Sequence, residues 1–193
     1  INAAILKFSS SGVDTVVFSV GNGGIPEVLF MQSAEQQQYR PAYLMGDSTN
    51  TSFVGNQAPD NQIKRISGAG TYPLANVGAD QYPSTALEKR CLAILNKEIG
   101  GYTNRSSSLT GTLYCEIIQS FAFVAARVQG PLTTASWAAA YHQIGRGYQA
   151  VTTFATHFLP GRQDGASGYR SLGFSTGCAC IAYTSPVRAI PAL

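Results

Sequence analysis

Charged side chains are scarce in this sequence, and so are the patterns that mark nucleic-acid-binding or membrane-spanning proteins. Asp, Glu, Lys and Arg together supply 12% of the 193 residues, about half the share in an ordinary soluble domain. The 13 Lys and Arg residues form no cluster beyond the pairs Lys64-Arg65 and Lys89-Arg90, and the net charge is only +3. A nucleic-acid-binding surface needs a basic stripe or patch, so we expect no nucleic-acid partner. No apolar run approaches the roughly 18 residues that a transmembrane helix requires.

The sequence motifs of nucleotide-binding and hydrolytic enzymes are absent or incomplete. The glycine loop at residues 21–24 lacks the G-x-G-x-x-G spacing of dinucleotide-binding folds, and no P-loop lysine follows it. Gly46-Asp47-Ser48 follows a predicted strand, as the nucleophile block of some esterases does, but the chain has no G-x-S-x-G elbow. Neither His142 nor His157 has an Asp three residues before it. A serine hydrolase that uses Ser48 is therefore only an alternative, and we expect no enzyme.

Four cysteines offer disulfides more readily than a metal site. Cys91 and Cys115 fall on consecutive predicted helices, on or beside the apolar stripe of each, so packing of these helices would bring them within bonding distance. We favour a Cys91–Cys115 disulfide. For Cys178 and Cys180 the sequence leaves open a bond across a bulge or two reduced thiols. A tetrahedral metal site needs four ligands, and the cysteines and histidines lack the spacing for one, so we expect no metal or other cofactor.

The stretch from Asp14 to Asn50 has the pattern of a strand, a glycine loop, a helix and a second strand. Its first apolar run, DTVVFSV, is rich in β-branched residues, as buried parallel strands are. After the loop, apolar residues recur at helical spacing, and Pro26 falls in the first turn, where its missing N–H does no harm. Arg40-Pro41 closes this helix, and AYLM forms the next strand. The sequence therefore predicts an α/β fold with parallel-sheet βαβ units and flanking helices.

Each of these two predicted strands ends in a polar loop. Gly21 and Asn22 follow the first strand, and Asp47 and Ser48 follow the second. Ligands of open α/β sheets bind beyond the carboxyl ends of the strands, so the two loops share one edge of the sheet. We predict a ligand-binding site there. The plainer alternatives are a tight turn for the glycine loop and a helix cap for Asp47 and Ser48.

The segments that flank this unit are less regular. Residues 1–8 have the spacing of an amphipathic helix, and because the chain opens inside that helix without Met, we expect it to be part of a larger polypeptide. Residues 51–64 show no clear periodicity, and RISGAGTY predicts another strand or an extended crossover. Prolines and glycines across residues 73–83 then mark a boundary or hinge.

The second half of the chain predicts helices and then a hairpin. The first helix starts at the capping box Thr85-x-x-Glu88, the second follows a Ser-rich linker at 106–108, and Thr133 or Thr134 caps the third. The Thr- and aromatic-rich run at 151–158 suggests an extended segment. Two short strands, at 169–174 and 178–184, predict a terminal hairpin.

In this order the elements resemble the C-terminal part of type I periplasmic binding proteins, the extracytoplasmic solute receptors of ABC importers. The resemblance is to the branched-chain amino-acid (Leu/Ile/Val) group in particular. It rests on the stretches INAAILKFSSSGVDTVVFSVGNGGIPEVLFMQSAEQQQYRPAYLMGDSTN, IKRISGAGTYP, SLTGTLYCEIIQSFAFVAARVQGPLTTASWAAAYHQIG, FLPGRQDGASGYRSLGF and GCACIAYTSP. It implies a fold of two lobes joined by crossing strands. Residues 1–72 would belong to the second lobe, 73–172 mainly to the helices of the first lobe, and 173–193 to a strand that returns to the second.

The resemblance also implies a function and a set of partners. The expected function is capture of a small polar ligand such as an amino acid by lobe closure, with delivery to an ABC permease. Asp47 would anchor a cationic group, Ser48 and Asn22 would exchange hydrogen bonds, and Gly21 would let the backbone approach the ligand. The expected location is extracytoplasmic, with a lipid anchor on the full-length protein. The missing N-terminal half of the receptor would supply the other wall of the cleft, so this chain alone is expected not to bind ligand.

Two features keep the ligand and the role open. The Leu/Ile/Val group commonly has an aromatic residue in the first loop, whereas this loop is GNGG, so the ligand is an amino acid, a small amide or another compact metabolite. A ligand-sensing receptor domain of the same fold is the alternative to an importer subunit, because a fold does not determine a function.

Overall fold

The computed structural model describes residues 1–19, 23–73, 83–102, 105–161 and 164–191, and these residues form two compact units. The first unit contains Ile1–Gly70 and Arg170–Pro186, and the described residues of the second are 71–73, 83–169 with the two gaps, and 187–191. The predicted final segment, 173–193, is thus divided between the two units at Pro186. The assignment of each unit to a receptor lobe stays a prediction.

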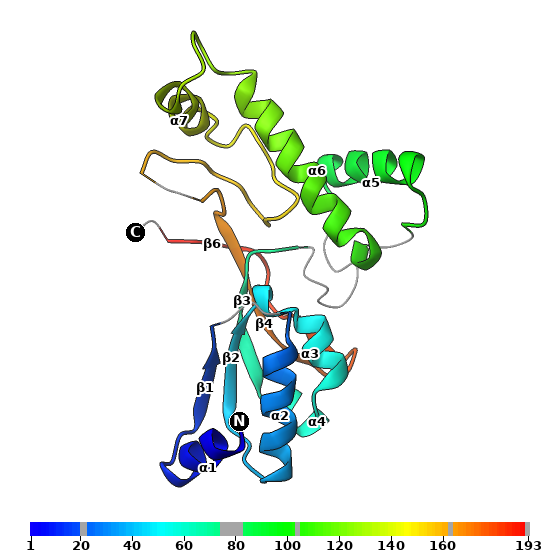
Figure 1. Ribbon diagram of the computed structural model, residues 1–193, viewed down its shortest axis with the longest axis vertical. Helices are drawn as coiled ribbons and strands as arrows, with labels where there is room; N and C mark the ends of the chain where they lie inside the picture. Colours follow the sequence, from blue (N-terminus) through cyan, green and yellow to red (C-terminus); the bar gives the residue numbers. More distant parts are fainter. Residues whose placement is uncertain (20–22, 74–82, 103–104, 162–163, 192–193) are drawn as a thin grey trace. The chain divides into compact units, whose positions relative to one another are not determined.

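The first unit is built on a sheet that begins with three parallel strands (Figure 1). Its strands, in spatial order, are β1 (Thr15–Phe18), β2 (Ala42–Gly46), β3 (Ile66–Gly70), β4 (Gly168–Ser175) and β5 (Cys180–Tyr183). The pairs β1–β2 and β2–β3 are parallel, whereas β3–β4 and β4–β5 are antiparallel. The predicted βαβ unit, third strand and terminal hairpin are therefore confirmed. In the second unit, the first residues of β4 pair with the short strand β6 (Arg188–Ala189).

Helices occupy the connections between the parallel strands. They are α1 (Asn2–Ser10), α2 (Ile25–Gln36), the 3-10 turn η1 (Asp47–Thr49), α3 (Thr51–Gln57) and α4 (Asp60–Ile63). The amphipathic helix expected at the start and the helix after the glycine loop are both present. The helices α3 and α4 were not predicted, because seven and four residues are too few to build a periodic apolar stripe.

One face of the sheet carries the core of the first unit. Strand register places Val16 beside Tyr43 and Phe18 beside Met45, so these side chains share a face. Tyr43 is fully buried; its ring stacks on Phe18 with centroids 5.6 Å apart and meets Phe30 of α2 edge-on at 6.4 Å. Burial of one such large apolar side chain stabilises the fold by about 1.5–3 kcal/mol. This packing holds α2 against the sheet.

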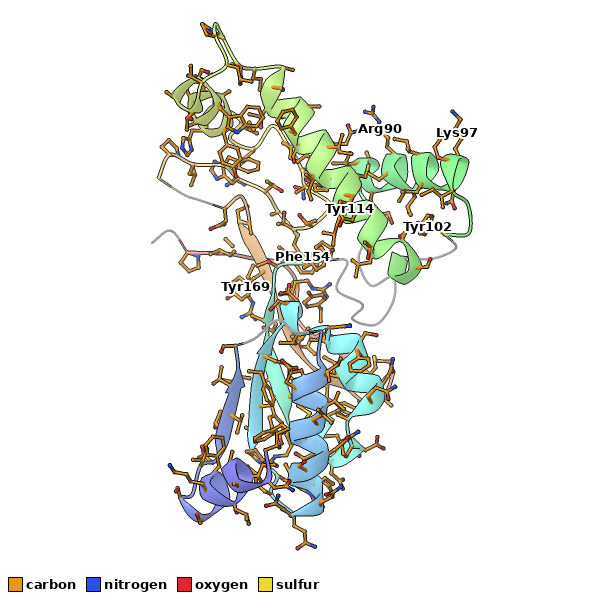
Figure 2. The ribbon with its side chains drawn as sticks, in the orientation of Figure 1. Arg90, Lys97, Tyr102, Tyr114, Phe154 and Tyr169 are labelled. Atoms are coloured by element: carbon orange, nitrogen blue, oxygen red, sulfur yellow. A yellow bond between two sulfur atoms is a disulfide. The ribbon has the colours of Figure 1, made fainter. Side chains whose placement is uncertain are left out.

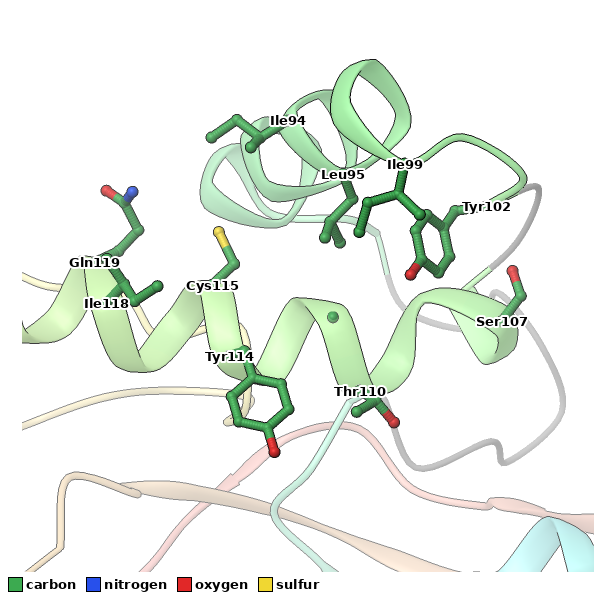
Figure 3. A pocket seen from close by; sticks show the side chains of 11 residues that line it. Ile94, Leu95, Ile99, Tyr102, Ser107, Thr110, Tyr114, Cys115, Ile118 and Gln119 are labelled. Atoms are coloured by element: carbon green, nitrogen blue, oxygen red, sulfur yellow. The ribbon is translucent and has the colours of Figure 1, made fainter.

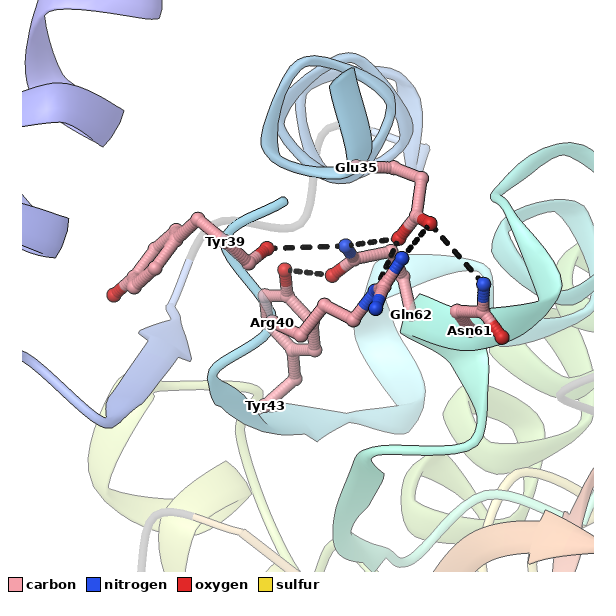
Figure 4. A network of polar contacts seen from close by, with 6 residues as sticks. All are labelled: Glu35, Tyr39, Arg40, Tyr43, Asn61 and Gln62. Atoms are coloured by element: carbon pink, nitrogen blue, oxygen red, sulfur yellow. Dashed lines mark hydrogen bonds and ion pairs between the residues drawn. The ribbon is translucent and has the colours of Figure 1, made fainter. Parts of the chain in front are cut away.

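A polar network that runs from the buried Tyr43 and Gln62 to the Glu35–Arg40 ion pair at the surface joins β2 to the helices that cover this face (Figure 4). The Tyr43 hydroxyl donates to Oε1 of Gln62 at 2.5 Å, and Gln62 Nε2 donates to the Glu35 carboxylate at 2.7 Å and the Tyr39 carbonyl at 3.1 Å. Arg40 pairs with Glu35 at 2.6 Å. The bond from Arg40 is the main reason why the pKa of Glu35 falls to about 2, and burial raises the pKa of Tyr43. Each polar group that Tyr43 and Gln62 bring into the core thus has a partner.

The second unit contains three helices, α5 (Ala86–Glu98), α6 (Arg105–Ala125) and α7 (Thr134–Gln143). Thr85 accepts from the backbone N–H of Glu88 at the start of α5, and Thr133 forms a capping box with Ser136 at the start of α7. Arg90 and Lys97 extend from α5 into solvent (Figure 2). Two predictions here are wrong. Residues 106–108 belong to α6 rather than to a linker, and residues 151–158 contain no strand, only a single bridge from Thr156.

The second unit is held together by a disulfide, an apolar cluster and a buried carboxylate. Cys91 and Cys115 form a disulfide, with Cα atoms 5.8 Å apart, that joins α5 to α6. Glu116, also on α6, is buried; it accepts from the Tyr148 hydroxyl at 2.8 Å and from the Val151 N–H at 2.7 Å. This carboxylate therefore ties the loop after α7 to α6. The apolar cluster is built from Val124, Ala140, Ile144, Tyr148, Ala150 and Phe158.

Candidate ligand site at the carboxyl ends of the strands

The strands β1, β2, β3 and β5 of the first unit end at one edge of its sheet. Because β4 is antiparallel to both β3 and β5, strand β5 runs in the same direction as β2 and β3. Asp47 follows β2 directly, Gly70 is the last residue of β3, and Tyr183 is the last residue of β5. The strand ends thus bring together a carboxylate, a phenol and a residue without a side chain. This is the edge at which open α/β sheets bind their ligands.

Asp47, Gly70 and Tyr183 lie within contact distance of one another. The Tyr183 hydroxyl is 3.5 Å from Oδ2 of Asp47, at the long limit for a hydrogen bond. A Cβ atom added to Gly70 would lie 2.6 Å from both of these oxygen atoms. Only glycine therefore leaves Asp47 and Tyr183 in their places. Asp47 is half-buried, which lowers the competition from water for any cation that it binds.

Arg170, opposite Gly70 in the sheet, supports the Tyr183 side of the site. Its Nε donates to the Ser185 carbonyl at 2.6 Å, and its guanidinium carbon lies 5.1 Å from the centroid of the Tyr183 ring. The Ser185 hydroxyl accepts from the Ser171 N–H at 2.8 Å, which fixes the chain that follows β5. A cation at this distance is attracted by the face of the ring. Arg170 therefore lies against the Tyr183 ring and is hydrogen-bonded to the chain that follows β5.

The turn after β2 presents Ser48 to solvent. Ser48 is exposed in the middle of η1, and the Thr49 hydroxyl donates to the Gly46 carbonyl at 2.6 Å, which closes the turn. The helix-cap alternative for Asp47 and Ser48 is wrong, because the residue that caps α3 is Asn50, whose side chain accepts from the Phe53 N–H. Both predicted residues therefore lie on the turn itself, ahead of the residue that caps α3.

The other predicted loop meets this turn at its last glycine. Gly24 has φ +86°, and a Cβ there would lie 2.9 Å from the Thr49 carbonyl oxygen. The end of the glycine loop thus packs against η1, as expected for two loops that share one edge of the sheet. Gly21 and Asn22 lie outside the described residues, so their part in the site stays a prediction.

Sequence reasoning missed Tyr183, Gly70 and Arg170. The predicted hairpin placed Tyr183 near the end of the last strand, and counting strand directions across the sheet would have brought it to this edge. The close approach at Gly70 and the support from Arg170 depend on contacts between distant segments, which the sequence does not display.

Neither histidine of the chain lies in the unit that carries Ser48. His142 and His157 both belong to the second unit, so residues 1–70 and 170–186 hold no histidine to act as the base of a serine nucleophile within this unit. Among the described residues, no group of three or more His, Cys, Asp or Glu is placed to hold a metal ion. Nor does any described helix combine the length and apolar character needed to cross a lipid bilayer.

The second unit carries a separate apolar groove between α5 and α6, with a volume of about 600 Å³ (Figure 3). Its apolar walls include Ile94, Leu95 and Ile99 from the α5 side, and Tyr114 and Ile118 from α6. The side chains at Tyr114, Ile117, Ile118 and Phe121, here called the α6 stripe, are 59–65% exposed. They recur at i, i+3, i+4 and i+7, the spacing of a helix face that packs against another element. Figure 2 shows Tyr114 on this helix.

Known structures share this architecture, although no family model and no curated protein sequence matches the chain. A branched-chain amino-acid ABC transporter protein from Thermus thermophilus, crystallised with bound valine, matches 97% of this chain and 49% of its own, with a TM-score of 0.67 and 18% identity. A leucine-binding protein from Thermotoga maritima aligns with 96% of this chain and with 47% of its own length, with a TM-score of 0.58 and 12% identity. A type 1 periplasmic binding protein from Bordetella pertussis aligns with 100% of this chain and with 50% of its own length, with a TM-score of 0.60 and 13% identity.

The chain has the type I periplasmic-binding-protein fold. The prediction of this α/β fold is confirmed. The chain spans about half the length of the solved structures that it matches. At 12–18% identity the likeness establishes the fold and not the ligand.

Proposed function

We propose that this chain is part of an extracytoplasmic solute receptor of an ABC importer and that it binds a small polar ligand, such as an amino acid, at Asp47. The observation that carries the proposal is the position of the Asp47 carboxylate. It stands at the carboxyl edge of a sheet whose fold is shared with a receptor crystallised with valine. Asp47, Gly70 and Tyr183 would form one wall of the ligand cleft.

The chemistry of this wall favours a ligand with an ammonium group. A carboxylate binds an ammonium group through charge-assisted hydrogen bonds, which are stronger than bonds between neutral groups. The Ser48 hydroxyl and the Asn22 amide would add neutral bonds, and Gly21 would let the backbone approach the ligand. Because Tyr183 occupies the space beside Asp47, the ligand-binding wall suits a compact ligand better than a large one.

Each unit has an exposed apolar surface, and both surfaces are consistent with contact to a further polypeptide. In the first unit, Val17 and Leu44 point away from the core and remain 64% and 40% exposed, although parallel sheets are normally covered on both faces. In the second unit the α6 stripe is exposed. Large exposed apolar patches mark interaction sites. We assign both surfaces to the N-terminal half of the receptor, because about half of each matching structure has no counterpart in this chain.

The ligand proposal is tested by thermal-shift screening of the full-length receptor. Amino acids and small amides are compared with 2-hydroxy acids, which keep the shape and the carboxylate of an amino acid but lack its ammonium group. We expect an amino acid to raise Tm and its hydroxy analogue to have little effect, because Asp47 selects for the cation. Equal stabilisation by both members of a pair would contradict the role of Asp47.

The import role is tested separately, by uptake of the identified ligand in cells with and without the receptor gene. Loss of uptake on deletion is the expected result. Uptake that persists while a ligand-dependent cellular response disappears would favour the alternative, a sensing receptor of the same fold.

A further inference from the structure

The hairpin between β4 and β5 carries a disulfide that joins two cysteines only two positions apart. Cys178 and Cys180 are bonded, and Cys180 is the first residue of β5, paired across the hairpin with Ser175. Cys178 lies in the exposed turn, whereas Cys180 is half-buried. The bond therefore stays within one turn and ties no distant segments together.

This position makes the bond a poor structural brace. The stabilisation that a disulfide gives by restricting the unfolded chain grows with the number of residues that it encloses. Cys91–Cys115 spans 24 positions and joins two helices, with Cys91 fully buried. Cys178–Cys180 encloses a single residue, so its removal costs the fold little. It therefore adds less to stability than Cys91–Cys115 does.

Ala179, the residue between the two cysteines, favours opening of the ring that the Cys178–Cys180 bond closes. Ala179 has φ +49°, in the left-handed region that a side chain with a Cβ atom disfavours. When the bond opens, the turn is free to relax and Ala179 can return to ordinary backbone angles. Exposure and backbone cost together characterise labile disulfides rather than structural ones.

We propose that Cys178–Cys180 is a thiol–disulfide exchange site that accepts two electrons from dithiol reductants. A thiolate of the reductant attacks the exposed sulfur of Cys178, the S–S bond breaks, and Cys180 leaves as a thiolate that takes up a proton. The second thiol of the reductant then attacks the mixed disulfide and releases Cys178 as a thiol. The protein gains two electrons and two protons, and the reductant leaves as its own disulfide.

The test is a titration of the native chain with dithiothreitol, followed by an acid quench, alkylation and peptide mass spectrometry. Cys91–Cys115 serves as the control within the same molecule. We expect Cys178 and Cys180 to be alkylated at a dithiothreitol concentration lower by about tenfold or more than that which opens Cys91–Cys115. Simultaneous reduction of both pairs, earlier reduction of Cys91–Cys115, or free thiols at Cys178 and Cys180 before any reductant is added would overturn the proposal.

Two additional experiments test which reductant supplies the electrons and why the Cys178–Cys180 bond is labile. If both dithiothreitol and a protein that carries a Cys-x-x-Cys dithiol reduce Cys178–Cys180, the exchange site takes electrons from a protein partner. If only dithiothreitol reduces it, the exchange site takes electrons from small dithiols. Ala179→Gly removes the backbone cost of the closed ring. We expect this variant to need several-fold more dithiothreitol for half reduction, and an unchanged or lower requirement would contradict the inferred cause.

Discussion

The hydroxyl of Tyr183 lies 3.5 Å from the Asp47 carboxylate, although 136 positions separate the two residues in sequence. One residue ends the last strand of the sheet, and the other follows its second strand. A glycine at the end of the third strand leaves the room in which they meet. The proposed ligand site depends on this three-way contact.

Gly70→Ala is expected to disturb the site and to lower stability. The added Cβ would lie 2.6 Å from oxygen atoms of both Asp47 and Tyr183, so one of them must move. Overpacking of this kind costs about 1–3 kcal/mol, which urea unfolding measures directly. Gly173→Ala in β4 is the matched control, because its Cβ would make ordinary contacts at 3.5 Å or more. Equal unfolding midpoints for the two variants would contradict the close approach at Gly70.

The Glu35 network predicts a loss of stability in acid. The pKa of Glu35 is lowered from 4.5 to about 2 in the folded chain, mainly by its hydrogen bonds from Arg40. A carboxyl with a depressed folded pKa stabilises the fold above its unfolded pKa, and this contribution disappears as the pH falls toward the folded value. The stability difference between the native chain and Glu35→Gln should therefore be full at neutral pH and shrink between about pH 4.5 and pH 2.

Urea midpoints at a series of pH values test the acid prediction. Glu98→Gln is the control, because Glu98 is exposed on α5 and its ion pair with Lys97 is at the surface. A Glu35→Gln difference that stays constant from neutral pH to about pH 2 would show that Arg40 does not hold the carboxylate in its charged form.

Glu116→Ala is expected to destabilise the second unit. The substitution removes the acceptor for the Tyr148 hydroxyl and for the Val151 N–H, both of them buried, and each unsatisfied buried donor costs about 1–3 kcal/mol. Thermal unfolding followed by near-ultraviolet circular dichroism measures the effect. Glu98→Ala is the control on a neighbouring helix, and a Tm for Glu116→Ala as high as that of the control would argue against the network.

The α6 stripe predicts a substitution that affects assembly but not folding of this chain. Ile118→Asp changes a side chain that is 64% exposed, so the isolated chain should keep its stability to within about 0.5 kcal/mol. In a co-expression experiment with the N-terminal half, the buried aspartate should prevent co-purification of the two halves.

Leu132→Asp supplies the control for this assembly experiment. Leu132 is 71% exposed but lies outside the stripe, in the connection between α6 and α7. We expect this variant to co-purify with the N-terminal half as the native chain does. If Ile118→Asp does so too, the stripe is not covered by that half.

Local patterns in the sequence were sufficient for much of the first unit. The apolar run that ends at Phe18 and Pro26 in the first turn of α2 each fix an element over a few residues. The predicted helix end at Arg40-Pro41 is wrong, because α2 already ends at Gln36 and Gln38 has a positive φ of 56°. The short helices between Thr51 and Ile63 could not be found in this way, because their ends are set by the Asn50 cap and by packing rather than by periodicity. The serines at 106–108 lie in the first turn of α6 and Ser108 is buried, whereas their composition alone indicated a linker.

The candidate site was predictable only in part. Asp47 and Ser48 follow a strand whose pattern is clear, so their place at the carboxyl edge could be inferred from strand direction alone. Tyr183 and Gly70 join them through sheet topology that involves the last strands of the chain, and Arg170 acts through the Ser185 carbonyl. Such contacts between distant segments depend on how the whole unit folds.

The most direct test of the account is calorimetric titration of the full-length receptor with the amino acid found by screening, for the native protein, Asp47→Asn and Asp14→Asn. Asp14 is exposed just before β1, at the opposite edge of the sheet from Asp47. Loss of a hydrogen bond to a charged group should weaken binding about 10- to 100-fold for Asp47→Asn, while Asp14→Asn binds as the native protein does. Native affinity in Asp47→Asn would contradict the claim that this carboxylate anchors the ligand.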